Sequence, residues 1–419
     1  MAIKPNIEVN KRSYRAPRAP AIVICLDGCE PAYLDEAISA GLMPHLKRIR
    51  ESGTDRLAHS VIPSFTNPNN LSIATGQPPI VHGICGNYLF DPDTGEEVMM
   101  NDVRFLRAPT IFSSFQKSGA MVAIVTAKDK LRALLGAELE PEENGTCCFS
   151  AEKSASTSLA EHGIENASDW LGMAQPEVYS ADLSEFVFAA GVKLLTDRRP
   201  DLMYLTTTDY VQHKHAPGAK DANSFYAMFD GYLGQLDAMG AAIVTTADHG
   251  MKPKHTVNGE PDVIYVQTVL DEMFGKGESR VILPITDPYV VHHGALGGFA
   301  TAYLPAKANH ADVVAKLADI KGMLLVLDKP AAVERFQLPA DRIGDIIMIS
   351  DENVVIGTSV EGHDLAALKE PLRSHGGLTE QVVPFIVNRT IDLPNAPELN
   401  NYDAIFYATQ AAQQTIETS

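Results

Sequence analysis

Runs of apolar and β-branched residues mark the strands that this sequence predicts. AIVICL begins at residue 21, LMYLTTT at residue 202 and AIVTTA at residue 242. Runs without alternating polar residues are typical of strands buried on both faces of a parallel sheet. Each run is followed directly by an aspartate. The pattern therefore places one carboxylate at the carboxyl end of each of three predicted strands.

Helical spacing of apolar positions separates these strands. It recurs at residues 33–40, 44–50, 183–196 and 222–238. Such alternation of strand and helix predicts right-handed crossovers and an α/β fold, in which helices flank a mostly parallel central sheet. The other elements that we predict for this core are a strand at 57–62, a helix at 67–74, a hairpin at 88–100, a helix at 110–117, and strands at 121–126 and 382–388.

Residues 262–367 interrupt this alternation and form a block of their own. Short strands and two helices within the block predict a smaller α+β cap, inserted into a core of residues 1–261 and 368–419. Residues 131–180 mix Gly, Ser, Thr and acidic residues, and we expect them to form a loop-rich surface at one edge of the site. The predicted cap elements are helices at 263–274 and 311–320 and strands at 280–284, 299–304, 324–327 and 345–349.

Composition and charge narrow the classes of partner. The chain has 419 residues, of which 45% are hydrophobic, and its formal net charge is −19. This charge argues against a nucleic-acid partner, because such binding needs Lys and Arg to neutralise phosphates. A small anionic substrate stays compatible with it if bound metal ions supply local positive charge.

The sequence also bears on compartment. The first twenty residues lack the apolar segment of a secretory signal, and no run approaches the roughly 20 apolar residues of a membrane span. Five cysteines, an odd number without zinc-knuckle spacing, predict free thiols. We therefore expect a cytoplasmic protein without a membrane partner, and a homodimer is compatible with the sequence.

Thr66 occupies a position that favours anion binding. It lies between the predicted strand 57–62 and the predicted helix 67–74, so its hydroxyl should lie at a helix N-terminus. Backbone N–H groups at such a terminus attract anions. A lone Thr in this position is most often only a helix N-cap. The residues that accompany it favour a catalytic interpretation.

Histidines accompany the aspartates at two of the predicted strand ends. His213 follows Asp209 by four residues, which would place both on one helical face, and His249 follows Asp248 directly. Because ligands of open α/β sheets bind beyond the carboxyl ends of strands, Asp27, Asp209 and Asp248 could converge there. Imidazole and carboxylate ligands suit zinc, and they also accept manganese or iron.

The motifs around Thr66 resemble those of a known family. P-x-x-T-x-P-N, then T-G-x-x-P and V-H-G-I-x-x-N, is similar to the nucleophile region of the nucleotide pyrophosphatase/phosphodiesterase branch of the alkaline phosphatase superfamily. The resemblance implies an alkaline phosphatase-like core with two Zn²⁺, for which Mn²⁺ or Fe²⁺ could substitute. It also implies Thr66 as nucleophile and Asn87 as donor to the phosphoryl oxygens. The implied metal ligands are Asp27, Thr66, Asp248 and His249 at a four-ligand site, and Asp209, His213 and His375 at a three-ligand site with an open position.

Within that branch, the whole chain most resembles enzymes that hydrolyse the carbon–phosphorus bond of phosphonoacetate to acetate and phosphate. This reaction releases a carbon leaving group, so cations near the substrate carboxylate should stabilise the enediolate. Lys128 and Lys130 follow the predicted strand at 121–126 and are our candidates, with His215 as a further substrate-binding residue. An exposed lysine pair that opens a helix is an equally good interpretation of Lys128 and Lys130.

Two other functional classes remain as alternatives. A phosphodiesterase or phosphomonoesterase of the same superfamily would share the metal site and differ in its pocket. A metal-independent binding module would have little reason to carry seven ligand-type residues in the order of the superfamily.

Overall fold

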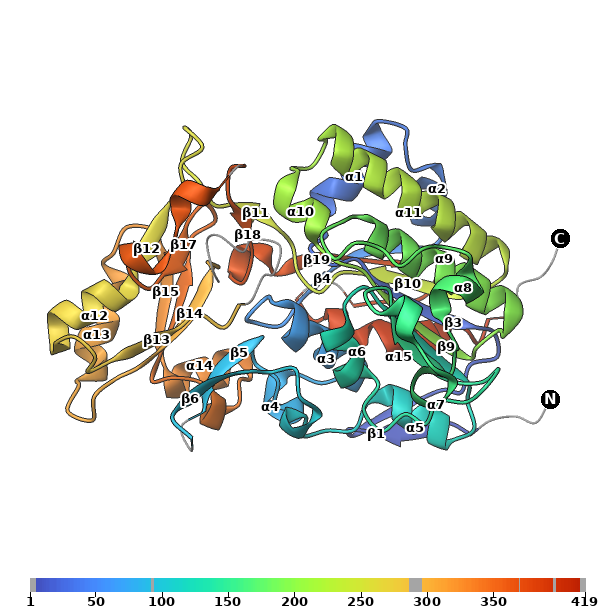
Figure 1. Ribbon diagram of the computed structural model, residues 1–419, viewed down its shortest axis with the longest axis horizontal. Helices are drawn as coiled ribbons and strands as arrows, with labels where there is room; N and C mark the ends of the chain where they lie inside the picture. Colours follow the sequence, from blue (N-terminus) through green and yellow to red (C-terminus); the bar gives the residue numbers. More distant parts are fainter. Residues whose placement is uncertain (1–4, 92–93, 286–295, 369, 395–396, 415–419) are drawn as a thin grey trace.

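A seven-stranded sheet forms the centre of the larger part of the computed structural model (Figure 1), which describes residues 5–91, 94–285, 296–368, 370–394 and 397–414. The strand order is β4-β19-β10-β3-β9-β7-β8. β19 runs opposite to all the other strands of this sheet, which share one direction, so the predicted mostly parallel sheet is confirmed. The strands are β3 (Ala21–Cys25), β4 (Thr54–His59), β7 (Val122–Thr126), β8 (Cys147–Ser150), β9 (Leu202–Thr206), β10 (Ala242–Thr246) and β19 (Val382–Val387).

Helices cover both faces of this sheet, as the alternation of strands and helices predicts. Every residue of β3, β7, β9 and β10 is buried, which explains their unbroken apolar sequences. In the described part of the chain, no helix has the length and apolar character of a membrane span. One face carries α1 (Pro31–Ser39), α2 (Pro44–Ser52), α9 (Asp182–Asp197) and α11 (Lys220–Ala238), and the other carries α3 (Thr66–Thr75), α5 (Ile111–Lys117), α6 (Asp129–Leu135) and α15 (Ala404–Ala411) (Figure 1).

A second sheet lies beside the first, within the range predicted for the cap (Figure 1). Its order is β13-β14-β16-β15, and all its pairs are antiparallel. Side chains of β16 alternate between two clusters: Ile346 and Met348 pack within the cap, whereas Ile347 and Ile349 join the main core. The cap boundaries at 262 and 367 stay a prediction. The cap elements are β13 (Arg280–Ile282), β14 (Phe299–Tyr303), β15 (Met323–Asp328), β16 (Ile346–Ser350), α12 (Val266–Phe274), α13 (His310–Ala318) and α14 (Lys329–Phe336).

Four short strand pairs complete the described sheets. β11 (Lys252–Pro253) pairs antiparallel with β18 (Arg373–Ser374), where the chain leaves the core and later returns to it. β12 (Val263–Tyr265) pairs with β17 (Val355–Gly357), and β5 (Tyr88–Asp91) forms the predicted hairpin with β6 (Glu96–Met99). At the N-terminus, β1 (Ile7–Val9) pairs with β2 (Arg12–Tyr14).

The segment at 131–180 is more ordered than its composition predicts. It contains the edge strand β8 and the short helices α7 (Leu159–His162) and α8 (Ala167–Leu171). The four residues CCFS of β8 are all buried, but a run this short carries no readable period. The predicted strand at 57–62 is also displaced, since β4 pairs with β19 from Thr54 to His59.

Candidate active site

Strand register brings the three predicted aspartates together. β10, β3 and β9 are parallel neighbours, with Thr246, Cys25 and Thr206 side by side at their carboxyl ends. Asp248, Asp27 and Asp209 follow these residues after two or three positions. Because carboxyl ends of adjacent parallel strands meet at one edge, the carboxylates share one buried region.

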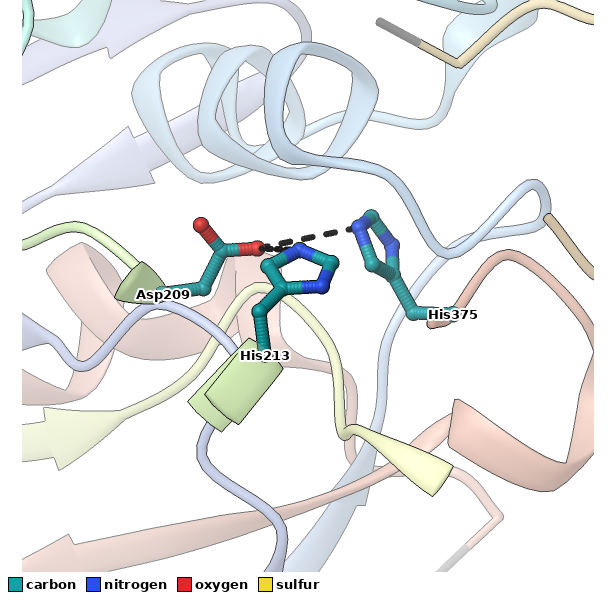
Figure 2. Close-up of side chains that lie close together, drawn as sticks. All are labelled: Asp209, His213 and His375. Atoms are coloured by element: carbon teal, nitrogen blue, oxygen red, sulfur yellow. Dashed lines mark ion pairs between the residues drawn. The ribbon is translucent and has the colours of Figure 1, made fainter. Parts of the chain in front are cut away.

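Asp209, His213 and His375 form the first of two candidate metal groups (Figure 2). His213 comes from α10 (Tyr210–Lys214), which begins directly after Asp209, and His375 follows β18. The Nε2 atoms of His213 and His375 lie 2.9 Å and 3.7 Å from Oδ2 of Asp209. All three residues are buried, and their ligand atoms lie within 4.8 Å of one another.

Asp27, Asp248 and His249 form the second group, again with ligand atoms within 4.8 Å. Nε2 of His249 lies 3.3 Å from Oδ1 of Asp27 and 3.4 Å from Oγ1 of Thr66. The rings of His249 and His375 stack with centroids 3.6 Å apart, so the two groups adjoin. The structure thus brings all seven predicted ligands together, and their division into four and three stays a prediction.

Hydrogen bonds fix the tautomer of each of these histidines. Nδ1 of His213 bonds the carbonyl of Arg373 at 2.9 Å, Nδ1 of His249 bonds the carbonyl of Gly250 at 2.9 Å, and Nδ1 of His375 bonds the carbonyl of Ser64 at 2.8 Å. A carbonyl oxygen only accepts, so each Nδ1 carries the proton. The lone pair of each neutral ring is therefore on Nε2, which faces the carboxylates, as metal-binding histidines require.

The electrostatics of the site favour a bound cation. Burial, together with the charges of Asp209 and Asp248, raises the pKa of Asp27 well above its ordinary value. Burial also raises the pKa of Asp248, whereas a protonated His213 beside Asp209 holds the pKa of that carboxylate below its ordinary value despite burial, a role that a metal ion on Nε2 would take over. Among the described residues, Oδ1 of Asp27 is buried without a hydrogen-bond donor. Carboxylates crowded in this way, beside imidazole nitrogens that face them, fit divalent metal ions of the zinc, manganese or iron type.

Thr66 begins α3 and faces this site. Phe65 occupies the N-cap position, so the interpretation of Thr66 as an N-cap is wrong. The hydroxyl of Thr66 is free of that role and lies next to His249, at the positive end of the helix dipole.

A cavity of about 290 Å³ opens beside the two groups. Thr66, Asn87, Lys128 and Lys130 all line it, together with Asp27, Asp209 and His375. Oδ1 of Asn87 accepts a hydrogen bond from the backbone N–H of Asn67 at 3.2 Å, which leaves the Nδ2 donor for the cavity. Nζ of Lys128 donates to the carbonyl of Val178 at 3.1 Å. The lysines do open a helix, since Lys128 is the N-cap of α6, and they also reach the cavity.

His215 lies outside the lining of this cavity as the described residues define it. Its Nε2 lies 3.6 Å from Oδ2 of Asp221. Its role in substrate binding stays a prediction, and its contacts with the described residues do not support it. Sequence reasoning missed nine of the described residues that line the cavity, which are Asn67, Met99, Asn101, Leu131, Glu152, Val178, Tyr179, Thr207 and Thr208. The expectation that 131–180 borders the site was the only signal for four of them, Leu131, Glu152, Val178 and Tyr179.

Comparison with known proteins places this site in a family. The family model for type I phosphodiesterase / nucleotide pyrophosphatase matches residues 21–378. An ectonucleotide pyrophosphatase/phosphodiesterase of Caenorhabditis elegans is 33% identical over 104 residues, which are 23% of this chain and 13% of that relative. The human family member 1 is 36% identical over 74 residues, which are 17% of this chain and 8% of that protein. The matches thus span only a small part of these curated relatives' own lengths.

Solved structures match the chain over nearly its whole length. Crystal structures of phosphonoacetate hydrolase from Sinorhizobium meliloti 1021, in complex with phosphonoacetate and with phosphonoformate, are each 69% identical with a TM-score of 0.95. Each comparison covers 98% of this chain and 100% of the other. Murine ectonucleotide pyrophosphatase/phosphodiesterase 5 is 19% identical over 95% of this chain and 96% of the other, with a TM-score of 0.63, and shares the fold.

Proposed function

This chain belongs to the type I phosphodiesterase / nucleotide pyrophosphatase family, and we propose that it hydrolyses the carbon–phosphorus bond of phosphonoacetate to acetate and phosphate. The observation that carries the proposal is the 69% identity, over 98% of the chain, to a hydrolase whose crystal structure contains phosphonoacetate. The cavity supports the proposal, because its lining combines candidate metal ligands with two lysines, Lys128 and Lys130. A small anionic phosphonate fits this arrangement of charge.

Asp27, Thr66, Asp248 and His249 would hold one metal ion, and Asp209, His213 and His375 a second. Two Zn²⁺ bound there would lower the pKa of the Thr66 hydroxyl and neutralise charge on the phosphonate. The hydroxyl of Thr66 gives up its proton to solvent, its Oγ1 attacks phosphorus, and the P–C bond breaks as the O–P bond forms. Asn87 donates from Nδ2 to a phosphoryl oxygen on which charge develops. Water then cleaves the phosphothreonine and releases phosphate.

The leaving group needs separate stabilisation. When the P–C bond breaks, its electron pair delocalises into the carboxylate as an enediolate, which takes a proton to become acetate. Lys128 and Lys130 supply positive charge on the cavity wall, where this negative charge grows. Their contact strengthens in the transition state and therefore accelerates the reaction rather than only binding the substrate.

Two measurements on the purified protein test this function. We expect two divalent metal ions per chain by elemental analysis, and release of acetate and phosphate from phosphonoacetate that a chelator abolishes and Zn²⁺ restores. Full turnover by demetallated protein would refute the metal assignment. A second assay uses a nitrophenyl phosphate ester. If this ester and a nitrophenyl diester were hydrolysed readily while phosphonoacetate was inert, the protein would be an esterase of the same superfamily.

The compartment belongs to the same proposal. All five cysteines are free thiols, which suits a reducing compartment, and we propose the cytoplasm. Fractionation of cells that express the full chain tests this assignment, because recovery in the membrane fraction or the medium would contradict it.

A further inference from the structure

Asn70 is a completely buried residue on α3, one helical turn after Thr66. Its Nδ2 donates to the carbonyl of Thr66 at 3.0 Å and to Oδ2 of Asp248 at 3.1 Å. Its Oδ1 accepts from the hydroxyls of Tyr204, at 2.7 Å, and Thr206, at 3.1 Å. The amide thus uses both of its donor hydrogens and both of its acceptor positions.

These four contacts join three segments whose relative positions the proposed mechanism requires to be fixed. Thr66 begins the helix of the nucleophile, Asp248 follows β10, and Tyr204 and Thr206 lie on β9, the strand that leads to Asp209. A carboxylate and a backbone carbonyl only accept, so the nitrogen of the amide must face the site and its oxygen must face β9. One side chain therefore sets the distance between a predicted metal ligand and the nucleophile.

We propose that Asn70 is a positioning residue of the four-ligand metal site, which orients the Asp248 carboxylate relative to Thr66. The inference rests on the metal site of the proposed function. The adjacent Asn69 has a different task, since its Nδ2 bonds the carbonyls of Val61, Pro63 and Phe65 in the loop before α3. Partners that hold metal ligands in this way typically contribute 10- to 100-fold to metal affinity.

The test is a titration of metal-free protein with Zn²⁺, which yields two dissociation constants for the unmodified chain. In Asn70→Leu we expect one constant to rise by about 10- to 100-fold and the other to stay unchanged. Asn70→Asp keeps the size of the side chain and can accept from Tyr204 and Thr206, but its carboxylate cannot donate to Asp248. It should weaken the same site, and it provides the test if the Leu variant does not fold.

Tyr204→Phe is the matched control. It removes a hydrogen bond from the oxygen side of Asn70 and leaves the contact with Asp248 in place, so we expect both zinc constants to be unchanged. A second readout is the steady-state kinetics at saturating Zn²⁺. Asn70 is buried and does not line the cavity of the described residues, so kcat should fall in Asn70→Asp with KM unchanged.

Failure of this inference differs from failure of the proposed function. If the unmodified chain binds no zinc, the metal site itself is refuted. If it binds two ions and both Asn70 variants bind them with unchanged constants, the role of Asn70 is refuted. Equal weakening of both metal sites would also refute the role of Asn70, because that result is expected of a residue that supports only the fold.

Discussion

The proposed role of Thr66 as the nucleophile depends on its surroundings rather than on its residue type. A threonine hydroxyl is almost wholly protonated at pH 7 and is a weak nucleophile without an activating group. In this structure it lies at the first residue of α3 and 3.4 Å from Nε2 of His249. That position combines the positive end of a helix dipole with a predicted metal ligand, and both would activate the hydroxyl in the proposed reaction.

Replacement of Thr66 separates nucleophilic attack from metal binding. Thr66→Ala should lower kcat by roughly 10³-fold or more, because removal of a nucleophile eliminates the covalent route. It should retain much of the metal, since Asp27, Asp248 and His249 remain. Thr66→Ser keeps a hydroxyl and should retain part of the turnover. Steady-state kinetics with metal analysis measure both effects, and near-normal kcat in the Ala variant would instead indicate direct attack by water.

The lysines are tested by comparing two substrates. Loss of the contact between Lys128 or Lys130 and the substrate carboxylate should remove roughly 1.5–3 kcal/mol, or about 10- to 150-fold in kcat/KM for phosphonoacetate. An aryl phosphate ester has no carboxylate in its leaving group, so its hydrolysis should change far less in the same Lys→Ala variant. Equal losses on both substrates would show that the lysine supports the metal site or the fold.

The order of residues in the sequence was sufficient to identify the candidate metal ligands. It was not sufficient to predict the direction in which side chains point. Asp209 and His213 were paired correctly because α10 puts residues i and i+4 on one face. His215, two residues further, follows the end of that helix and faces Asp221 instead. Asn70 was not recognised as important, because its partners Asp248 and Tyr204 are distant in sequence and a single chain does not reveal such contacts.

At the scale of elements, the loop at residues 374–377 depends on one glycine. Gly376 has φ +121°, and a Cβ at this position would overlap the ring of Phe65. The ring of Phe65 also packs edge-on against His375, at 5.6 Å between centroids. The loop therefore positions His375 by close packing that only glycine permits.

Gly376→Ala should consequently displace His375 and weaken the three-ligand metal site. We expect the variant to retain about one metal ion per chain after dialysis, measured by elemental analysis, and to melt at a lower temperature. Gly119→Ala is the matched control, because Gly119 also has positive φ, at +86°, but nothing lies within 4 Å of an added Cβ. The control should lose roughly 1–2 kcal/mol of stability from backbone strain alone and keep both ions. Unchanged metal content in Gly376→Ala would contradict the role of this loop.

Elements with long apolar runs were predictable, and short ones were not. β3, β9 and β10 each end close to the predicted residue because burial on both faces requires an unbroken run. β8 was missed because its four residues carry no period, although the central sheet buries all of them. The ends of β4 depend on its register with β19, a partner more than 300 residues away in sequence.

At the scale of the whole molecule, a buried ion pair lies where the chain leaves the core for the predicted cap and where it returns. Lys254 follows β11 and Glu380 follows β18, and Nζ of Lys254 lies 2.9 Å from Oε1 of Glu380. Both side chains are fully buried. Glu380 also contacts the two loops that carry His249 and His375. Its Oε2 accepts from the N–H of Gly377, and its carbonyl accepts from the N–H of Gly250. The pair therefore connects the cap junction to His249 and His375.

Removal of one partner of this pair should destabilise the whole molecule. Lys254→Met leaves the Glu380 carboxylate buried without its cation, and we expect the free energy of unfolding to fall by about 3–5 kcal/mol in urea titrations. Lys254→Met/Glu380→Gln removes both charges and should recover most of that loss, because desolvation of the ions offsets much of their attraction. The exposed pair Lys117–Glu138 is the control, and Lys117→Met should change stability by at most about 1 kcal/mol.

If the double variant were as unstable as Lys254→Met, the loss would come from packing around Lys254 rather than from an unpaired charge. The predicted cap would then be held to the core by apolar contacts, such as those of Ile347 and Ile349. The ion pair would serve only to orient the loops that carry His249 and His375.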